Sequence, residues 1–219
     1  MEIQTTADGS NTLFVPALDE HYHSIKGALT ESQHIFIKMG LHECKVAEPR
    51  ILEVGFGTGL NAILTLAEAE ERGPIHYTTL ERYPLSIEVI RQLGYDNLLE
   101  EKTASFFPTL HQVPWNEWQE ITEKFRLRKI ECDLTTLKIE EGYDVIYYDA
   151  FAPEKQPDMW TQEIFEKLYA CMAPDGIFVT YCAKGVVRRM LQTAGFTVER
   201  LAGPPNGKRE ILRGRKSGK

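Results

Sequence analysis

A glycine-rich segment, Glu53-Val-Gly-Phe-Gly-Thr-Gly-Leu-Asn61, has the residue types and spacing of a ligand-binding loop. Glycines let a backbone turn tightly and approach a ligand, and the N-terminus of a following helix directs free N–H groups at polar or anionic groups. The glycines are spaced as GxGxG rather than GxGxxG, which weakens the prediction of a nicotinamide dinucleotide. A tight strand-to-helix turn without a ligand is the structural alternative.

Acidic residues follow the next two predicted strands. Glu81 stands 22 residues beyond Gly59, where a carboxylate can accept hydrogen bonds from both hydroxyls of a ribose. Asp133 can accept a hydrogen bond from an adenine amino group. The alternatives are a surface pair of Glu81 with Arg82 and a capping role for Asp133. Together with the glycine-rich loop, these acids predict a nucleoside bound without phosphates, and a sulfonium nucleoside fits because it carries an amino-acid tail in place of pyrophosphate.

A third acid, Asp149, follows the apolar segment 143–148 and begins the string Asp149-Ala-Phe-Ala-Pro153. Ligands of open α/β sheets bind outside the carboxyl ends of the strands, so Asp149 is the candidate for contacting the reacting group. A carboxylate beside a protonated amine can hold it and help to remove its proton. A cap of the next turn is the alternative. A stacking pocket for a flipped-out base is predicted from Phe151, Pro153, Met159 and Trp160, although the last two residues could instead pack against the following helix.

Basic residues gather between Lys184 and Lys219, where only Glu199 and Glu210 are acidic, although the whole chain has a net charge of −7. This asymmetry suggests a polyanion at one side of the protein, with a solvated tail as the alternative. RNA phosphates could be held by residues at a helix start and at the final turn, namely Lys184, Arg188, Arg189, Lys208 and Arg209.

Strands separated by helices must position these residues. Strands are predicted at 50–54, 75–80, 126–132, 143–148 and 177–181, and helices at 60–72, 85–93, 164–172 and 186–194. The pattern predicts an α/β fold with a doubly wound, mostly parallel sheet, and segments 197–200 and 209–213 predict an antiparallel C-terminal edge hairpin. Residues 174–176 are expected to form a turn.

The N-terminal part lacks this alternation. Residues 1–29 are expected to form loops or short strands, and the capping-box spacing of Thr30 and Gln33 predicts a helix that starts at Thr30. We expect a single domain, in which an extension over 1–45 covers the ligand site and 46–219 forms the core with its basic end.

The composition excludes several classes of protein. Hydrophobic residues make up 42% of the 219 residues and charged residues 26%, as in a soluble globular protein. There is no apolar run near the roughly 20 residues that span a bilayer, and the polar N-terminus argues against secretion. The four cysteines form no CxxC pair and the histidines lack a metal-ligand spacing. We therefore expect a cytoplasmic protein with reduced thiols, no metal and no membrane partner.

Several motifs give the chain a resemblance to a known family. They are Gly55-Phe-Gly-Thr-Gly-Leu-Asn61, Leu80-Glu-Arg-Tyr-Pro-Leu85, Asp149-Ala-Phe-Ala-Pro153 with Pro157-Asp-Met-Trp160, Val187-Arg-Arg189 before Ala194-Gly-Phe196, and Gly207-Lys-Arg-Glu210. Through them the chain resembles the methyltransferase half of the bacterial tRNA 5-methylaminomethyl-2-thiouridine biosynthesis proteins (MnmC) and its stand-alone relatives. The similarity covers about residues 20–213.

The resemblance implies a class I S-adenosylmethionine-dependent fold of Rossmann-like type. It also implies methyl transfer to the amine of 5-aminomethyl-(2-thio)uridine at the wobble position (U34) of tRNA. The glycines would line the methionine part of the cofactor, Glu81 would hold the ribose, Asp133 the adenine and Asp149 the reacting amine. Other cofactor contacts implied are Glu53, Phe56, Thr58, Asn61 and Arg82, with Tyr22, Ser24 and Glu31 from an N-terminal segment that folds over the cofactor.

The chain departs from the family in some places. The fused proteins carry a flavin-dependent oxidase domain for which this chain has no room, so a separate enzyme would supply the 5-aminomethyl substrate if it arises by that route. Ala150 stands in place of a glycine, and the ending Gly203-Pro-Pro-Asn-Gly-Lys-Arg differs from that of the family. Three other functions stay open: the same fold acting on a small molecule or protein, a nicotinamide-dependent oxidoreductase, and a non-catalytic RNA-binding module.

Overall fold

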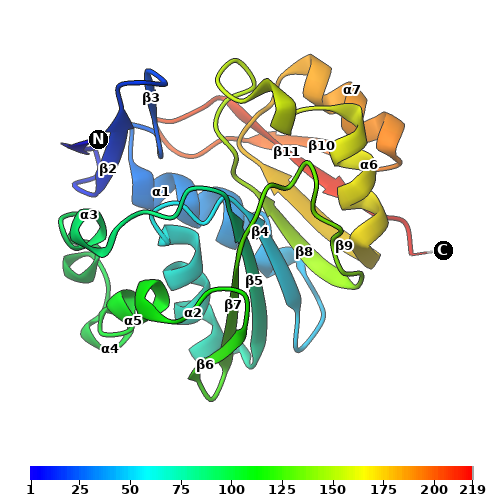
Figure 1. Ribbon diagram of the computed structural model, residues 1–219. Coiled ribbons are helices and arrows are strands. Elements are labelled where there is room, and N and C mark those ends of the chain that lie inside the picture. The colour runs from blue at the N-terminus through cyan, green and yellow to red at the C-terminus, as the bar shows by residue number, and fades with distance from the viewer. Residues whose placement is uncertain (219) are drawn as a thin grey trace.

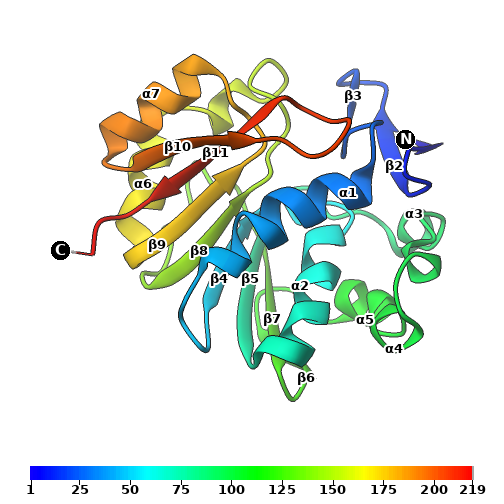
Figure 2. The same cartoon turned by 180° about the vertical axis from the view of Figure 1, so that it is seen from behind.

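Five parallel strands form the centre of an eight-stranded sheet in the computed structural model, which describes residues 1–218 (Figures 1 and 2). The order across the sheet is β10-β11-β9-β8-β4-β5-β7-β6. The parallel strands are β9 (Met172–Thr180), β8 (Tyr143–Tyr148), β4 (Arg50–Val54), β5 (Ile75–Glu81) and β7 (Phe125–Glu131). The antiparallel strands are β6 (Trp118–Thr122), β10 (Thr197–Ala202) and β11 (Glu210–Arg215). This confirms the predicted α/β class and its mostly parallel sheet.

Helices cover both faces of the sheet. On one face lie α1 (Ala28–Ser32), the π-helix η1 (Gln33–Lys38) and α2 (Leu60–Arg72); on the other lie α6 (Gln162–Cys171) and α7 (Gly185–Ala194) (Figures 1 and 2). Neighbouring residues of β4 point to opposite faces, so Ile51 packs with α2 and Leu52 with α6. Because both faces are buried, the central strands β4, β5 and β8 are rich in apolar and aromatic residues, and this made them recognisable in the sequence.

The smaller helical elements connect these layers. They are η2 (Leu41–Glu43), α3 (Ile87–Arg91), η3 (Tyr95–Asn97), α4 (Glu101–Ala104), α5 (Phe107–Gln112) and η4 (Pro157–Met159). The helix expected over 85–93 is thus shorter than predicted. None of the helices within residues 1–218 is long and apolar enough to cross a membrane.

The C-terminal hairpin is antiparallel as predicted, but its second strand lies inside the sheet. β11 pairs with β9 on one side and with β10 on the other, so β10 forms the edge. The prediction of a turn at 174–176 is wrong, because these residues belong to β9. The register with β8 shifts there, between the pairs Tyr143↔Met172 and Val145↔Ile177, so the segment is an irregularity within the strand.

The N-terminal residues form a separate three-stranded sheet of β1 (Glu2–Thr5), β2 (Asn11–Val15) and β3 (Glu20–His21). The helix start expected at Thr30 is wrong, since α1 begins at Ala28. Its cap comes from Asp8, whose Oδ2 accepts hydrogen bonds from the N–H and the hydroxyl of Thr30, each at 2.8 Å. A carboxylate from the turn between β1 and β2 therefore replaces the local capping box.

Candidate active site

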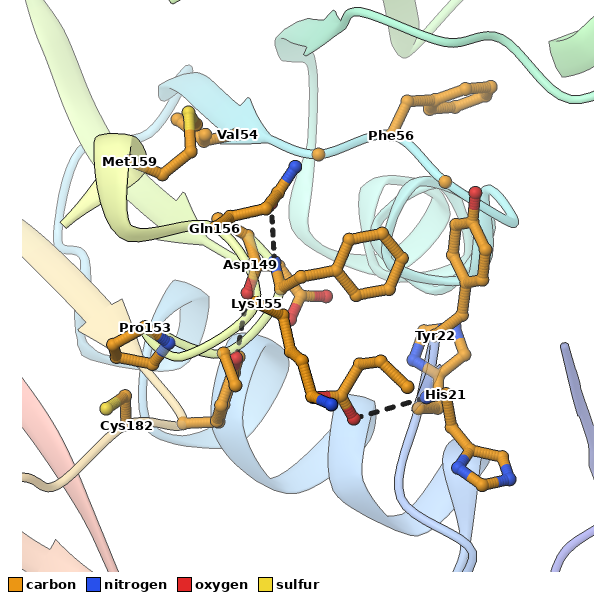
Figure 3. Close-up of a pocket in the computed structure, with 18 of the residues that line it drawn as sticks. His21, Tyr22, Val54, Phe56, Asp149, Pro153, Lys155, Gln156, Met159 and Cys182 are labelled. Carbon is orange, nitrogen blue, oxygen red and sulfur yellow. Dashed lines mark hydrogen bonds between the residues drawn. The ribbon is translucent and has the colours of Figure 1, made fainter. Parts of the chain in front are cut away.

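A cavity of about 990 Å³ opens at the carboxyl ends of the parallel strands (Figure 3). The segments after β4, β5, β7, β8 and β9 line it, as ligands of open α/β sheets require. Two further walls come from residues 20–25, which include β3 and the segment after it, and from residues 208–210, where the β10–β11 connection enters β11.

The glycine-rich loop between β4 and α2 is shaped by close contacts that exclude side chains. Gly55 has a φ of +93°, and a Cβ there would lie 2.8 Å from the carbonyl oxygen of Asp149. Gly57 has a φ of +48°, and a Cβ there would lie 2.9 Å from the ring of Tyr22. Only glycine allows the loop to lie this close to both neighbours.

Glu81 fixes this loop at the end of β5. Its Oε2 accepts a hydrogen bond from the Gly57 N–H at 3.0 Å, and its Oε1 accepts one from the Tyr83 N–H at 2.8 Å. A carboxylate oxygen can accept more than one hydrogen bond, so both oxygens keep acceptor capacity toward the cavity that Glu81 lines. Arg82 does not pair with Glu81.

Arg82 instead pairs with Asp133, with 2.7 Å between Nη1 and Oδ2. Oδ1 of Asp133 accepts hydrogen bonds from the N–H and the hydroxyl of Thr135, at 2.9 and 2.6 Å, and these lower the pKa of the carboxyl. Asp133 therefore has the capping geometry that was the alternative for it, while it still lines the cavity.

Two residues expected at the cofactor direct their side chains elsewhere. The ring of Phe56 points away from Asp149 (Figure 3) and packs against His111 and Trp115. The hydroxyl of Thr58 is hydrogen-bonded to Nε2 of His23 at 2.7 Å. Both residues line the cavity, and these side-chain contacts support the loop from behind; their contact with the cofactor stays a prediction.

Asp149 lies on the cavity floor, where Asn61 Nδ2 donates a hydrogen bond to its Oδ2 at 2.9 Å. Burial raises the pKa of Asp149 to about 7, and the negative charge of Glu31 adds to this rise. The hydrogen bond from Asn61 and the positive charge of Lys208 act in the opposite direction. Asp149 can therefore change protonation state near neutral pH, as a general base must.

Glu53 lies beneath this floor and is fully buried. Burial raises its pKa to about 8, against the effect of a hydrogen bond from Thr79 Oγ1 to its Oε2 at 2.7 Å. At neutral pH it is thus mainly protonated. Its part in the site is to support the strand end that carries the glycine-rich loop.

Residues 20–25 of the N-terminal segment line one side of the cavity. The Tyr22 ring lies over Gly57 and meets the ring of Phe151 edge-on, with 5.0 Å between centroids. Burial and the charge of Glu81 raise the pKa of Tyr22 to about 12, so the phenol keeps its proton. The Ser24 N–H donates a hydrogen bond to Glu31 Oε2 at 2.9 Å, which links this segment to α1.

The predicted stacking residues divide into two groups. Phe151 and Pro153 line the cavity, as does Met159. The prediction that Trp160 stacks on a base is wrong, because its side chain is buried and does not line the cavity. Its Nε1–H donates a hydrogen bond to the Phe151 carbonyl oxygen at 2.7 Å. Packing around α6, the alternative for Trp160, is what the structure shows.

The basic residues divide in the same way. Lys184, which pairs with Glu154, lines the cavity together with Lys208 and Arg209. Arg188 and Arg189 do not line it, because they lie on α7 behind the cavity rim. Tyr181 is a wall residue that the sequence-based predictions missed; its place directly after β9, like that of Asp149 directly after β8, was the signal that could have found it.

The side chains of the site are not arranged as the ligands of a metal ion. Within residues 1–218, no group of three or more His, Cys, Asp or Glu side chains is placed to hold a metal ion. Cys44, Cys132, Cys171 and Cys182 are free thiols.

The site fits a nucleoside with an amino-acid tail. The glycine loop leaves room for close backbone approach, and Glu81 can accept further hydrogen bonds. A parallel sheet with an antiparallel C-terminal hairpin and a glycine-rich loop after its central strand defines the fold class of S-adenosylmethionine-dependent methyltransferases. Spermidine synthase from Thermotoga maritima shares this fold, with a TM-score of 0.57 and 16% identity over 100% of this chain and 72% of that one.

The chain belongs to a family of S-adenosyl-L-methionine-dependent methyltransferases, whose family model matches residues 94–217. It is similar to the tRNA 5-methylaminomethyl-2-thiouridine biosynthesis bifunctional protein MnmC of Cupriavidus necator, at 31% identity over 87% of this chain and 31% of that protein. With the MnmC protein of Pseudomonas fluorescens the identity is 33%, over 90% of this chain and 32% of that protein. The chain thus spans about a third of the length of these relatives.

A solved structure extends this similarity to the fold as a whole. The crystal structure of MnmC2 from Aquifex aeolicus matches with a TM-score of 0.77 and 27% identity, over 100% of this chain and 70% of that chain.

Proposed function

We propose that this protein methylates the primary amine of 5-aminomethyl-(2-thio)uridine at the wobble position (U34) of tRNA, to give 5-methylaminomethyl-(2-thio)uridine. The observation that carries the proposal is the placement of Asp149, a carboxyl with a pKa raised to about 7, on the floor of a cavity bordered by the glycine-rich loop. The similarity to proteins named for 5-methylaminomethyl-2-thiouridine biosynthesis supports this acceptor.

The cofactor side of the cavity is assigned to the glycine-rich loop and the two neighbouring strand ends. Gly55, Gly57 and Gly59 approach the methionine part, Glu81 holds the ribose, and Asp133 with Arg82 borders the adenine. S-adenosyl-L-methionine, when bound, supplies an activated methyl group on its sulfonium centre. Residues 1–45 are assigned to the cover of this site and 46–218 to the core; Lys219, the last residue of the predicted core, lies outside the described residues.

Asp149 acts on the acceptor in this proposal. An amine is nucleophilic only when it is neutral, so the ammonium group must lose a proton before transfer. Asn61 holds Oδ2, which leaves Oδ1 to receive that proton. Holding the nitrogen in one place also removes the entropy that free encounter would lose, which is a large part of what positioning contributes.

RNA binding is assigned to the basic residues at the cavity mouth, namely Lys184, Lys208 and Arg209. Phosphate contacts make affinity fall with salt concentration, with a slope that follows the number of phosphates neutralised. Phe151 and Pro153 border the path of the flipped-out base. We place the reaction in the cytoplasm, and a separate enzyme that supplies the 5-aminomethyl group stays a prediction.

A methylation assay tests the function. Labelled S-adenosyl-L-methionine is incubated with bulk tRNA from cells that lack the final wobble-uridine methylation step, and the nucleosides are resolved by mass spectrometry. The expected product is heavier by one methyl group than 5-aminomethyl-2-thiouridine and is absent with Asp149→Ala. Cofactor binding without modification of this nucleoside would contradict the acceptor and redirect the search to other RNAs, small molecules or proteins.

A further inference from the structure

The ammonium group of Lys208 lies in an unusual environment at the mouth of the cavity. Its Nζ is 3.6 Å from the centroid of the Tyr181 ring and 3.6 Å from Oε1 of Glu31. A cation over an aromatic face and beside a carboxylate is stabilised by both. Lys208 comes from the β10–β11 connection, Tyr181 from the end of β9 and Glu31 from α1, so three distant segments build this environment.

The walls of this environment have more hydrogen-bond acceptors than donors. Glu31 Oε1 is buried and has no hydrogen-bond partner among the described residues. Lys208 is too far from Glu31 Oε1 to donate a normal hydrogen bond. Buried acceptors without donors are unfavourable, and a primary ammonium group carries three N–H donors.

The aromatic wall is held in a fixed relation to Asp149. The Tyr181 hydroxyl donates a hydrogen bond to the carbonyl oxygen of Ala150 at 2.8 Å, and Ala150 directly follows Asp149. The charges of Glu31 and Lys208 both act on Asp149, in opposite directions. The ring and the two carboxylates therefore surround one small volume, which suits a single positive charge.

We infer that the Tyr181 ring, Glu31 and Asp149 form the binding site for the primary ammonium group of the acceptor, and that Lys208 is its built-in occupant. The inference rests on the proposed function and names the group of the acceptor that this part of the cavity selects. The acceptor's ammonium replaces that of Lys208, which then becomes free to pair with an RNA phosphate. A neutral substituent on the base gains neither the aromatic face nor the carboxylates.

The position in the sheet assigns this site to the acceptor rather than to the cofactor. The glycine-rich loop follows β4 and Glu81 is the last residue of β5, whereas Asp149 and Tyr181 follow β8 and β9, on the opposite side of β4. This revises the expected role of Glu31, from a cofactor contact to an acceptor contact.

A binding experiment with a simple ammonium ion tests the site without any reaction. The full-length protein is titrated with 1-butylammonium, and with 1-butanol as the neutral control, by ligand-detected NMR. The variants are Lys208→Met and, as a charge-matched control on the same hairpin, Arg200→Met. If Lys208 occupies the site about nine-tenths of the time, its removal raises the affinity for butylammonium roughly tenfold. Arg200→Met and butanol should show no gain, and a Lys208→Met protein that binds butylammonium no more tightly than wild type overturns the inference.

A second pair of variants separates a binding role of the ring from a folding role. Tyr181→Phe keeps the aromatic face and should retain butylammonium binding, whereas Tyr181→Leu should lose most of it. Thermal unfolding of each variant identifies losses that come from misfolding. Equal binding by both folded variants would contradict the aromatic wall.

The same titration distinguishes the two sources of an ammonium group. Butylammonium binding that persists with saturating S-adenosylhomocysteine supports an acceptor site. Competition between the two ligands would show that the site binds the cofactor's amino group, and this would overturn the inference. Glu31→Gln should weaken butylammonium binding and leave S-adenosylhomocysteine affinity within about threefold. If butylammonium behaves as expected but 5-aminomethyl-2-thiouridine in tRNA is not methylated, the proposed function fails while the ammonium site stands.

Discussion

Asp149 combines two properties: its carboxyl is half-buried, and it lines a cavity where a positively charged ligand can reach it. Burial raises its pKa to about 7, and the charge of Glu31 adds to that rise. In the proposed reaction an arriving ammonium group would favour the ionised carboxylate and so prepare it to accept a proton.

Replacing Asp149 by Asn should therefore lower turnover far more than cofactor affinity. General-base groups contribute typically about 10²–10⁴-fold to rate, so we expect a loss of that order in kcat with S-adenosylhomocysteine affinity unchanged within about threefold. Turnover of the wild type should rise with pH through about 7, because Asp149 ionises there. Turnover of Asp149→Asn should not show this rise. Steady-state methylation and calorimetry measure the two quantities, with exposed Asp96→Asn as the control. Equal losses of turnover and cofactor affinity would contradict the role of Asp149.

Glu53 gives a pH dependence of stability rather than of rate. Burial raises its pKa from 4.5 to about 8, so the folded protein keeps a proton that the unfolded chain releases between these values. The contribution of Glu53 to the free energy of unfolding therefore falls as pH rises from 4.5 to 8, by at most about 1.4 kcal/mol per pH unit.

We expect Glu53→Gln to remove this fall. Its stability relative to wild type should improve by on the order of a few kcal/mol between pH 5 and 8 and then level off. Urea unfolding at several pH values measures the difference, and exposed Glu48→Gln is the control. A difference that does not change with pH would show that the raised pKa is absent.

At the scale of elements, α1 depends on a cap that comes from another part of the chain. Burial alone would raise the pKa of Asp8, but hydrogen bonds from Ser10, Thr30 and Thr6 outweigh burial and hold the pKa well below its usual value. Asp8 also lies against Gly27, where a Cβ would approach its Oδ2 to 2.5 Å. The N-terminal sheet thereby fixes the start of the helix that carries Glu31.

Asp8→Ala should destabilise the protein by about 1–2 kcal/mol at pH 7, as the loss of a helix cap does. Because the folded-state pKa is depressed, the stability that Asp8 provides is present above about pH 4 and is lost as pH falls below it. The difference between wild type and variant should therefore shrink in acid, and Glu2→Ala on the same sheet should have little effect. Denaturant unfolding at pH 7 and pH 3 tests both statements.

The sequence allowed prediction of those elements whose residues carry their own pattern. β4 and β8 are largely buried on both faces and are mostly apolar or aromatic, and the α2 helix shows apolar residues at helical spacing. β6 was not predicted, because its residues are half-exposed at a sheet edge and show no clear alternation of apolar and polar side chains. The start of α1 was misplaced because Asp8, its cap, stands 22 residues before Thr30.

The site residues that directly follow a predicted strand could also be predicted from the sequence. Glu81 and Asp149 were found because they follow recognisable strands, and both line the cavity. The orientation of Phe56, Thr58 and Trp160 was not predictable, because it depends on partners such as His23 and His111 that come from distant segments. Side-chain direction is a tertiary property that a linear motif does not contain.

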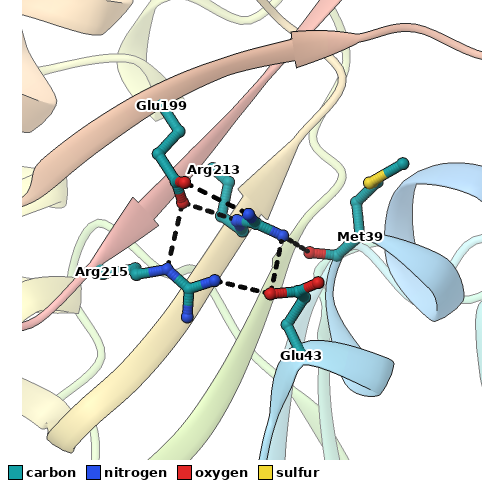
Figure 4. Close-up of polar contacts among 5 residues, drawn as sticks. All are labelled: Met39, Glu43, Glu199, Arg213 and Arg215. Carbon is teal, nitrogen blue, oxygen red and sulfur yellow. Dashed lines mark hydrogen bonds and ion pairs between the residues drawn. The ribbon is translucent and has the colours of Figure 1, made fainter.

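At the scale of the whole molecule, a partly buried charge cluster joins segments that are far apart in the sequence (Figure 4). Arg213 of β11 is 7% exposed and binds Glu199 of β10 at 2.7 Å, Glu43 of η2 at 3.2 Å and the Met39 carbonyl oxygen at 3.3 Å. Arg215 bridges the same two carboxylates from a more exposed position. The cluster ties the C-terminal hairpin to the segment that leads into β4.

Arg213→Met should destabilise the protein by about 2–3 kcal/mol, because removing one partner leaves partly buried carboxylates without their cation. Arg215→Met should have a smaller effect, since its side chain is 36% exposed. Urea unfolding of both variants gives the comparison. Equal losses for the two arginines would contradict the importance of burial in the cluster.

The insertion of β11 between β9 and β10 has a consequence for synthesis on the ribosome. Translation produces β9 and β10 before β11, so the apolar edge of β9 stays unpaired until Glu210–Arg215 has emerged from the exit tunnel. An unpaired strand edge can form hydrogen bonds with a wrong strand. Here β10 could pair directly with β9, although the native sheet has β11 between them. Lys208 precedes β11 by only a few residues, so the ammonium site and the sheet reach completion at nearly the same moment of translation.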